Sequence, residues 1–399
     1  MPWILLAMAF ALVGTLYALS RRGASGAADT VELIRAESIP GWMPGPGWAS
    51  AVPPRRAPGE AIRIPIYPPW TEAAAKVIFV PSVYEVFDAY CGKLWKPNLK
   101  FRMAFPEHPA GGIDFVLNSR SMREDDEPLP TRPALRVLVA GDSHTDGVCA
   151  NEESFANLTE VALELLAHAE SEANGLRFDP QSIEVLNAGK GSHSFFNYLG
   201  VLERNLDLKP DLFVVAVYGG NDFDEVLTAW HHFFNRGARP PGIDKYPDEF
   251  LRALRLSKAA MSQALSSIKY FDVNPDQFAI AVQAATDVCE QIQTLCRERG
   301  IRLFMVYLPA RCDVEPTNPD LNLDALMREL KLTPAALKHT DKLADAWLER
   351  LATLGVETLD MRPAFRRADH SVYWNTDWHI NLAGHQHVAR ALVKALAQR

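Results

Sequence analysis

The stretch Val137-Leu-Val-Ala-Gly-Asp-Ser-His-Thr-Asp-Gly147 decides how this chain is interpreted. It is an apolar run, typical of a buried strand, that leads directly into a turn with a serine at position 143. A serine hydroxyl is a weak nucleophile until a histidine accepts its proton and an acid orients that histidine. Two later segments, Gly219-Gly-Asn-Asp222 and Asp377-Trp-His379, carry side chains that suit such a site. These three segments favour serine-based ester chemistry.

Regular alternation of strands and helices begins near residue 134. The expected strands are Arg136–Ala140, Ser182–Asn187, Asp211–Tyr218, Ile301–Leu308 and Val356–Leu359. The expected helices are Ser154–Ala169, Phe195–Leu206, Asp276–Arg299, Ala335–Leu354 and Ala383–Ala397. Strands that are apolar throughout and alternate with helices imply a parallel sheet covered on both faces. The fold class is therefore predicted as α/β, a three-layer α/β/α sandwich.

Composition excludes some classes of function. The chain has 399 residues, is 48% hydrophobic and carries a net charge of −8, which argues against nucleic acid as its main partner. Five cysteines are scattered without CxxC spacing, so they are expected to be free thiols in the core. The pattern predicts neither a metal site nor a cofactor.

The N-terminal segment is apolar. Pro2–Leu19 has no charged residue and would be about 27 Å long as a helix, close to the thickness of a bilayer core. Residues 1–22 are interpreted either as a membrane anchor or as a secretory signal that is cleaved to leave a secreted or periplasmic protein. Arg21 and Arg22 follow the apolar run and no basic residue precedes it, which favours the anchor. By the positive-inside rule these arginines would place the rest of the chain in the cytoplasm, and the side of the membrane stays open.

Between this segment and the alternating region, the sequence has no regular pattern of strands and helices. Residues 23–65 are rich in Gly, Ala and Pro and are interpreted as a linker. Residues 66–133 form an irregular accessory region with two short strand candidates, Lys76–Val80 and Phe101–Ala104. Residues 134–399 are predicted to form the catalytic domain. Within it, residues 222–276 are more than the alternation needs and are a candidate lid.

Three chemistry-bearing segments follow the carboxyl ends of expected strands. Ser143 follows the first strand, residues 187–192 follow the second and Asn221 follows the third. Ligands in open α/β sheets bind beyond this edge, so the three segments are expected to meet there. Asp142 is expected to hydrogen-bond local backbone rather than to take part in chemistry.

These residues resemble the GDSL, or SGNH, hydrolases over about residues 134–397. GDSHTDG at 141–147, GGND at 219–222 and DWH at 377–379 are similar to three blocks of that family. The resemblance implies a flavodoxin-like sandwich in which Ser143 is the nucleophile, His379 the base and Asp377 the acid that orients it. It also implies an oxyanion hole made by the Asn221 side chain and the Ser143 backbone N–H.

The second block departs from the family pattern. It usually reads N-x-G-x-x-G, and the last glycine supplies a backbone N–H to the oxyanion hole. Here residues 187–192 read Asn-Ala-Gly-Lys-Gly-Ser, so Ser192 stands at that position. A backbone N–H survives the change if the backbone conformation tolerates a Cβ. The donor is therefore predicted to be Ser192 or, by a shift of one residue, Gly191.

Three functions are compatible with these residues. The first is an esterase that hydrolyses acyl or acetyl esters of a small molecule or a glycan. The second is an O-acyltransferase that uses the same site to acetylate an envelope glycan. The third is a glycan-binding protein whose site no longer catalyses a reaction. The complete set of Ser143, Asn221, Asp377 and His379 favours the first two.

Overall fold

The computed structural model describes residues 70–79, 82–173, 183–234, 263–315 and 323–397. At its centre is a five-stranded sheet in the order β6-β5-β7-β8-β9, with every neighbouring pair parallel. Its strands are β5 (Leu135–Gly141), β6 (Ile183–Asn187), β7 (Leu212–Tyr218), β8 (Arg302–Leu308) and β9 (Glu357–Asp360). In chain order the arrangement is 2-1-3-4-5, the flavodoxin-like order. The predicted fold class is confirmed.

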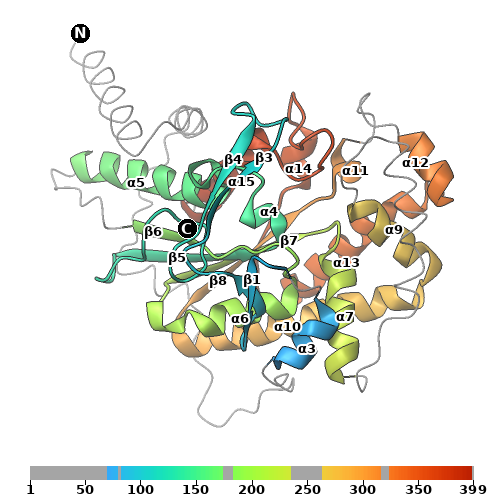
Figure 1. The fold of residues 1–399 in the computed structure, drawn as a ribbon, viewed down its shortest axis with the longest axis horizontal. Helices are drawn as coiled ribbons and strands as arrows, with labels where there is room; N and C mark the ends of the chain where they lie inside the picture. Colours follow the sequence, from blue (N-terminus) through green and yellow to red (C-terminus); the bar gives the residue numbers. More distant parts are fainter. Residues whose placement is uncertain (1–69, 80–81, 174–182, 235–262, 316–322, 398–399) are drawn as a thin grey trace.

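Helices cover both faces of this sheet (Figure 1). One face is covered by α5 (Phe155–Ala173) and α15 (Leu382–Ala397). The other is covered by α6 (Phe195–Arg204), α7 (Asp222–Phe234), α10 (Asp276–Arg299) and α13 (His339–Leu354). Strands β5, β6, β7 and β8 are buried along their whole length because both of their faces are covered. This burial explains why their sequences are apolar throughout rather than alternating.

The order of the strands changes direction between β5 and β7. The chain passes from β5 outward to β6 and then crosses back to β7 on the other side of β5. The connections after β5 and β7 therefore leave in opposite directions, and in open α/β sheets ligands bind at the carboxyl ends of strands beside such a switch point. Ser143 and Asn221 follow these two ends.

The part of the accessory region that the structure describes is built from one helix and two antiparallel hairpins. These elements are α3 (Glu72–Ile78), β1 (Glu85–Asp88) with β2 (Gly92–Trp95), and β3 (Lys100–Ala104) with β4 (Gly112–Val116). The strand expected at Phe101–Ala104 is thus confirmed. The strand expected at Lys76–Val80 is wrong, because α3 includes its first three residues. Thr71 caps this helix through its side chain, and Glu72 pairs with Lys76 one turn later at 2.7 Å.

Five further α-helices complete the described part of the chain. They are α4 (Ser143–Asp146), α9 (Gln263–Val273), α11 (Arg311–Val314), α12 (Leu323–Leu330) and α14 (Arg362–Arg366).

All five cysteines are free and buried, as the sequence predicted.

Several predictions fall on parts of the chain outside the described residues. These are the anchor or signal at 1–22, the linker at 23–65 and positions 235–262 of the candidate lid. Among the described ranges, no helix combines the length and the apolar character that crossing a bilayer requires.

Candidate active site

Ser143 stands at the first position of the short helix α4, immediately after strand β5. The Asp142 carboxylate caps this helix by accepting the His144 backbone N–H at 2.9 Å, which is the local role expected for it. Gly141 allows the turn to close, because a Cβ at this position would lie only 1.9 Å from Oγ1 of Thr145. Ser143 is half-buried, whereas Asp142 and His144 on either side of it are buried.

His379 and Asp377 approach Ser143 from a loop near the C-terminus. Nε2 of His379 lies 2.7 Å from Oγ of Ser143, and its Nδ1 hydrogen-bonds Oδ1 of Asp377. Trp378, between them, has a left-handed backbone with φ of 69°, and its side chain is buried. The Asp377 carboxylate also accepts the backbone N–H of His379 at 3.2 Å. Serine, histidine and aspartate therefore form one continuous hydrogen-bonded chain, the arrangement of a nucleophile, its base and an orienting acid.

The charges of this chain suit proton transfer. Burial acts to lower the pKa of His379, but the hydrogen bond and charge of Asp377 outweigh it and raise that pKa above its ordinary value. Burial acts to raise the pKa of Asp377, and the same interaction outweighs it and lowers that pKa. Asp377 therefore stays ionised at neutral pH, and His379 is a stronger base than a free histidine.

The loop after β6 lies against the serine. A Cβ placed on Gly191 would be 3.6 Å from Cβ of Ser143. The Gly191 N–H donates to Oδ2 of Asp146 at 3.1 Å, so it is already engaged. Within the described part of the chain, the backbone N–H groups of Ser192 and Ser143 have no hydrogen-bond partner. Of the two candidates in this loop, Ser192 is the one whose N–H is available to a ligand.

Ser192 occupies a backbone conformation that favours glycine. Its φ is 62°, in the left-handed region, where a Cβ crowds the neighbouring backbone. This position is the one at which the family pattern has glycine. The serine is therefore accommodated with its N–H in place, at the expense of some backbone strain.

Asn221 lies at the carboxyl end of β7, immediately before α7. Its side-chain Nδ2 donates to Oε1 of Glu225 at 2.8 Å, and its Oδ1 is buried without a partner among the described residues. Burial, helped by the charge of Asp224, raises the pKa of Glu225 to about 8, so Glu225 is mostly protonated at neutral pH. One hydrogen of the Asn221 amide is held by Glu225, and the second remains for a substrate oxygen.

Two residues of this site were not predicted. Asp146 fixes the Gly191 peptide and Glu225 fixes the Asn221 amide. Both were within reach of the sequence motifs: Asp146 stands three residues after Ser143, and Glu225 stands one helical turn after Asn221. No group of three or more metal-ligating side chains is gathered in a metal-binding arrangement in the described ranges.

Comparison with known proteins gives one family match. The family model described as "SGNH hydrolase-like domain, acetyltransferase AlgX" matches residues 269–399, a stretch that contains Asp377 and His379. This match confirms the resemblance to SGNH hydrolases that the motifs predicted. No curated protein matches the chain.

Solved structures give distant likenesses. An acetyl xylan esterase, AlAXEase, is 14% identical over 65% of this chain and 99% of its own, with a TM-score of 0.35. A catalytic mutant of an acetylxylan esterase from Geobacillus stearothermophilus is 13% identical over 67% of this chain and 96% of its own, with a TM-score of 0.34. A lipase/acylhydrolase from Enterococcus faecalis is 14% identical over 66% and 96%, with a TM-score of 0.34.

Proposed function

We propose that this protein, whose C-terminal part is SGNH hydrolase-like, is a serine enzyme that removes an acyl group from an ester. The observation that carries the proposal is the 2.7 Å contact between Oγ of Ser143 and Nε2 of His379, with Nδ1 of the same ring on Asp377. A surface serine with a local role would not need a buried imidazole whose basicity is raised by a carboxylate.

The proposed first half-reaction forms an acyl-enzyme. Ser143 Oγ attacks the carbonyl carbon of the ester while His379 Nε2 takes the hydroxyl proton. The carbonyl oxygen becomes an oxyanion, which accepts hydrogen bonds from the N–H groups of Ser143 and Ser192 and from the Asn221 amide. The bond to the leaving alcohol then breaks, and the imidazolium of His379 donates its proton to that alcohol.

The second half-reaction decides between two outcomes. His379 takes a proton from an incoming hydroxyl, whose oxygen attacks the acyl carbon. The bond from that carbon to Oγ of Ser143 then breaks, and His379 returns the proton to Oγ. If the incoming molecule is water, the protein is an esterase, which is the function that we propose first. If it is a glycan hydroxyl, the protein is an O-acyltransferase. The family match supports this second candidate, because that family model is described as an acetyltransferase.

The membrane attachment predicted from residues 2–19 belongs to the same proposal. An anchor helix would hold the enzyme at a membrane surface, which suits work on envelope glycans. The proposed substrates are accordingly acyl or acetyl esters of small molecules or glycans.

The test is turnover of p-nitrophenyl acetate by the full chain and by Ser143→Ala, with and without an added glycan acceptor. We expect the substitution to reduce turnover by more than about 10³-fold, because neither the oxyanion donors nor binding can replace the nucleophile. The circular dichroism spectrum should be unchanged. Free acetate as the product would identify an esterase, and acetylated acceptor would identify a transferase. A mutant that keeps the wild-type rate would overturn the proposal.

A further inference from the structure

The accessory hairpin β1–β2 encloses a lysine of the loop that carries Ser192. The Lys190 side chain is buried, with 2% of its surface exposed. Its Nζ lies 2.6 Å from Oε1 of Glu85 in β1 and 3.9 Å from the ring centroid of Trp95 in β2. The carboxylate and the aromatic face thus both stabilise the ammonium group.

This lysine also holds the peptide group of Ser192. Nζ of Lys190 donates to the carbonyl oxygen of Gly191 at 2.8 Å. That carbonyl and the N–H of Ser192 belong to the same planar trans peptide, so their directions are fixed relative to each other. When Lys190 holds the oxygen, it therefore also sets the direction of the Ser192 N–H.

A second contact from the hairpin holds the preceding peptide. Nε1 of Trp95 donates to Oδ2 of Asp146 at 3.1 Å, and the same oxygen accepts the N–H of Gly191 at 3.1 Å. Gly191 is thereby held at its N–H through Asp146 and at its carbonyl through Lys190. Both bonds depend on side chains that the hairpin β1–β2 positions.

The same accessory region reaches the two other loops of the site. Arg123 is fully buried and donates to the backbone carbonyls of Asp146, Gly147 and Cys149, just after the serine turn. The Glu107 carboxylate accepts the backbone N–H groups of Asn375 and Thr376, next to Asp377. Residues 85–123 therefore contact every loop that carries a proposed catalytic group, apart from that of Asn221.

We propose that Lys190, held by Glu85 and Trp95, is a positioning residue that fixes the Ser192 N–H as an oxyanion donor, and that the accessory region is thereby part of the active site. The inference rests on the proposed function of Ser143. It assigns a catalytic purpose to a region that the sequence left without one.

The test uses two substitutions and one matched control in the full chain. Lys190→Met keeps an apolar chain against the Trp95 ring and removes the ammonium group, while Lys93, 3.1 Å from Glu85, still neutralises that carboxylate. Trp95→Phe keeps an aromatic face and removes the indole N–H that holds Asp146. Arg102→Gln is the control, because it removes an exposed ion pair with Asp114 inside the hairpin β3–β4, away from the loop.

Two activities are measured for each protein. The first is turnover of p-nitrophenyl acetate, resolved into kcat and KM. The second is the rate at which a fluorophosphonate labels Ser143. In that reaction the Oγ–P bond forms, the P–F bond breaks, fluoride leaves and the proton passes to His379. The phosphonyl oxygen then occupies the oxyanion position, so labelling reports on that position without any acyl acceptor.

We expect Lys190→Met to reduce both kcat and the labelling rate by about 10- to 100-fold, since full loss of one oxyanion donor reduces rates by about 10²–10³-fold. KM should change by less than about threefold, because the donor acts on the transition state. Trp95→Phe should have a smaller effect in the same direction, and Arg102→Gln should have none.

Two results would overturn the inference. One is wild-type kcat and labelling rate in Lys190→Met and in Trp95→Phe, while Ser143→Ala is inactive. The other is a rise in KM without loss of kcat, which would place the lysine in substrate binding. A wild-type protein that neither turns over the ester nor is labelled at Ser143 would overturn the proposed function, and the inference with it.

Discussion

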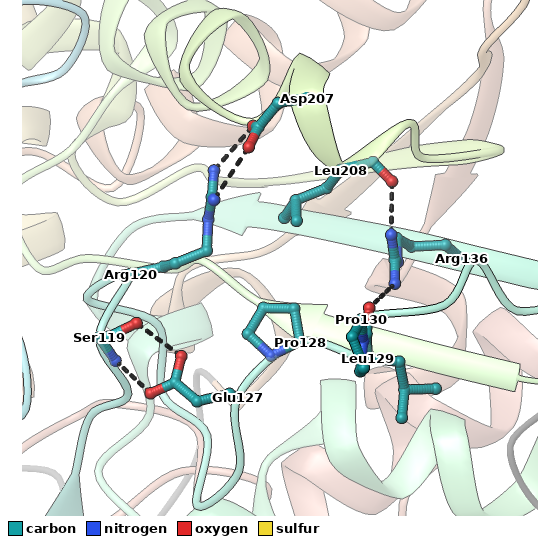
Figure 2. A pocket seen from close by; sticks show the side chains of 9 residues that line it. All are labelled: Ser119, Arg120, Glu127, Pro128, Leu129, Pro130, Arg136, Asp207 and Leu208. Atoms are coloured by element: carbon teal, nitrogen blue, oxygen red, sulfur yellow. Dashed lines mark hydrogen bonds and ion pairs between the residues drawn. The ribbon is translucent and has the colours of Figure 1, made fainter.

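The two ends of strand β5 differ in how completely their polar groups are paired. At the amino end, the guanidinium of Arg136 is buried and all three of its nitrogens donate: to Glu184, to the carbonyl of Leu208 and to that of Leu129. Figure 2 shows Arg136 beside a surface hollow, where Arg120 likewise pairs with Asp207. At the carboxyl end, the N–H groups of Ser143 and Ser192 and Oδ1 of Asn221 have no partner within the described residues.

This difference indicates that the amino end of β5 serves stability and that its carboxyl end serves the proposed reaction. A buried polar group without a hydrogen bond destabilises a fold by about 1–3 kcal/mol, so paired groups are the rule. The amino end follows this rule and is expected to contribute to stability alone. At the carboxyl end, the buried Oδ1 of Asn221 departs from this rule. The N–H groups of half-buried Ser143 and exposed Ser192 can be solvated, and they stay free for a substrate oxygen. Substitutions at the two ends should therefore have different consequences.

The largest expected effect belongs to Asp377→Asn at the carboxyl end. The amide can no longer hold His379 in the tautomer that accepts the Ser143 proton, and kcat should fall by about 10⁴-fold. The substitution also removes the charge that raises the pKa of His379, while burial continues to lower it. Because catalysis needs the neutral imidazole, the wild-type rate should rise with pH through a midpoint above 6.5, the ordinary pKa of histidine.

The measurement is the dependence of kcat/KM on pH for both proteins. In Asp377→Asn the residual rate should rise with a midpoint at lower pH than in the wild type. An unchanged midpoint would mean that another group is the base. Urea unfolding at neutral pH should show a loss of stability that is small beside the loss of kcat, because the fold lowers the pKa of Asp377 and so stabilises its ionised form.

The second effect belongs to the amino end. Glu184→Ala removes the partner of a buried arginine and should reduce the free energy of unfolding by about 3–5 kcal/mol. The kcat per folded molecule should be unchanged, because the site is at the opposite end of the strand. Urea unfolding and turnover at the same temperature measure the two quantities.

A double substitution serves as the control for this prediction. Glu184→Leu together with Arg136→Met replaces the ion pair by apolar side chains and should recover part of the lost stability. The recovery is partial because the carbonyls of Leu208 and Leu129 lose the donors that Arg136 supplied. If the single variant lost activity at full stability, the separation between the two ends would be wrong.

The third effect is that of Asn221→Ala. Loss of this amide should lower kcat by about 10²–10³-fold and leave KM within about threefold of the wild type, since the donor acts mainly on transition-state charge. The free energy of unfolding should also fall by about 1–3 kcal/mol, because the substitution removes the hydrogen bond that Nδ2 of Asn221 donates to buried Glu225. Steady-state kinetics with p-nitrophenyl acetate measure both constants. A rise in KM with unchanged kcat would move Asn221 out of the oxyanion hole.

The sheet and the candidate triad could be predicted because their signals are local. A buried parallel strand is apolar throughout, and Ser143, Asn221, Asp377 and His379 each stand in a short block of recognisable sequence. The strand expected at Lys76–Val80 failed for a related reason, because a short apolar run does not distinguish helix from strand by periodicity. There the structure has a helix, which Thr71 caps through its side chain.

The supports of the site could not be predicted in the same way. Trp95 contacts Asp146 across 51 residues, and Glu85 contacts Lys190 across 105 residues. Their own segments carry no periodic pattern that would place them at the edge of the sheet. Only the folded chain brings a lysine, a carboxylate and an indole together around one peptide group.

The smallest expected effect is that of Ser192→Gly. The left-handed conformation at φ of 62° costs a residue with a Cβ about 1–2 kcal/mol, and glycine loses about 0.5–1 kcal/mol through the greater freedom of its unfolded chain. The variant should therefore be more stable by up to about 1.5 kcal/mol, as urea unfolding would show. Lys209→Gly, with φ of 53° at the amino end of β7, should stabilise the protein similarly and serves as the control.

Turnover should stay within about twofold in both variants, because the proposed donor is the backbone N–H, which glycine retains. A loss of more than tenfold in Ser192→Gly alone would mean that the serine hydroxyl, and not its N–H, meets the substrate.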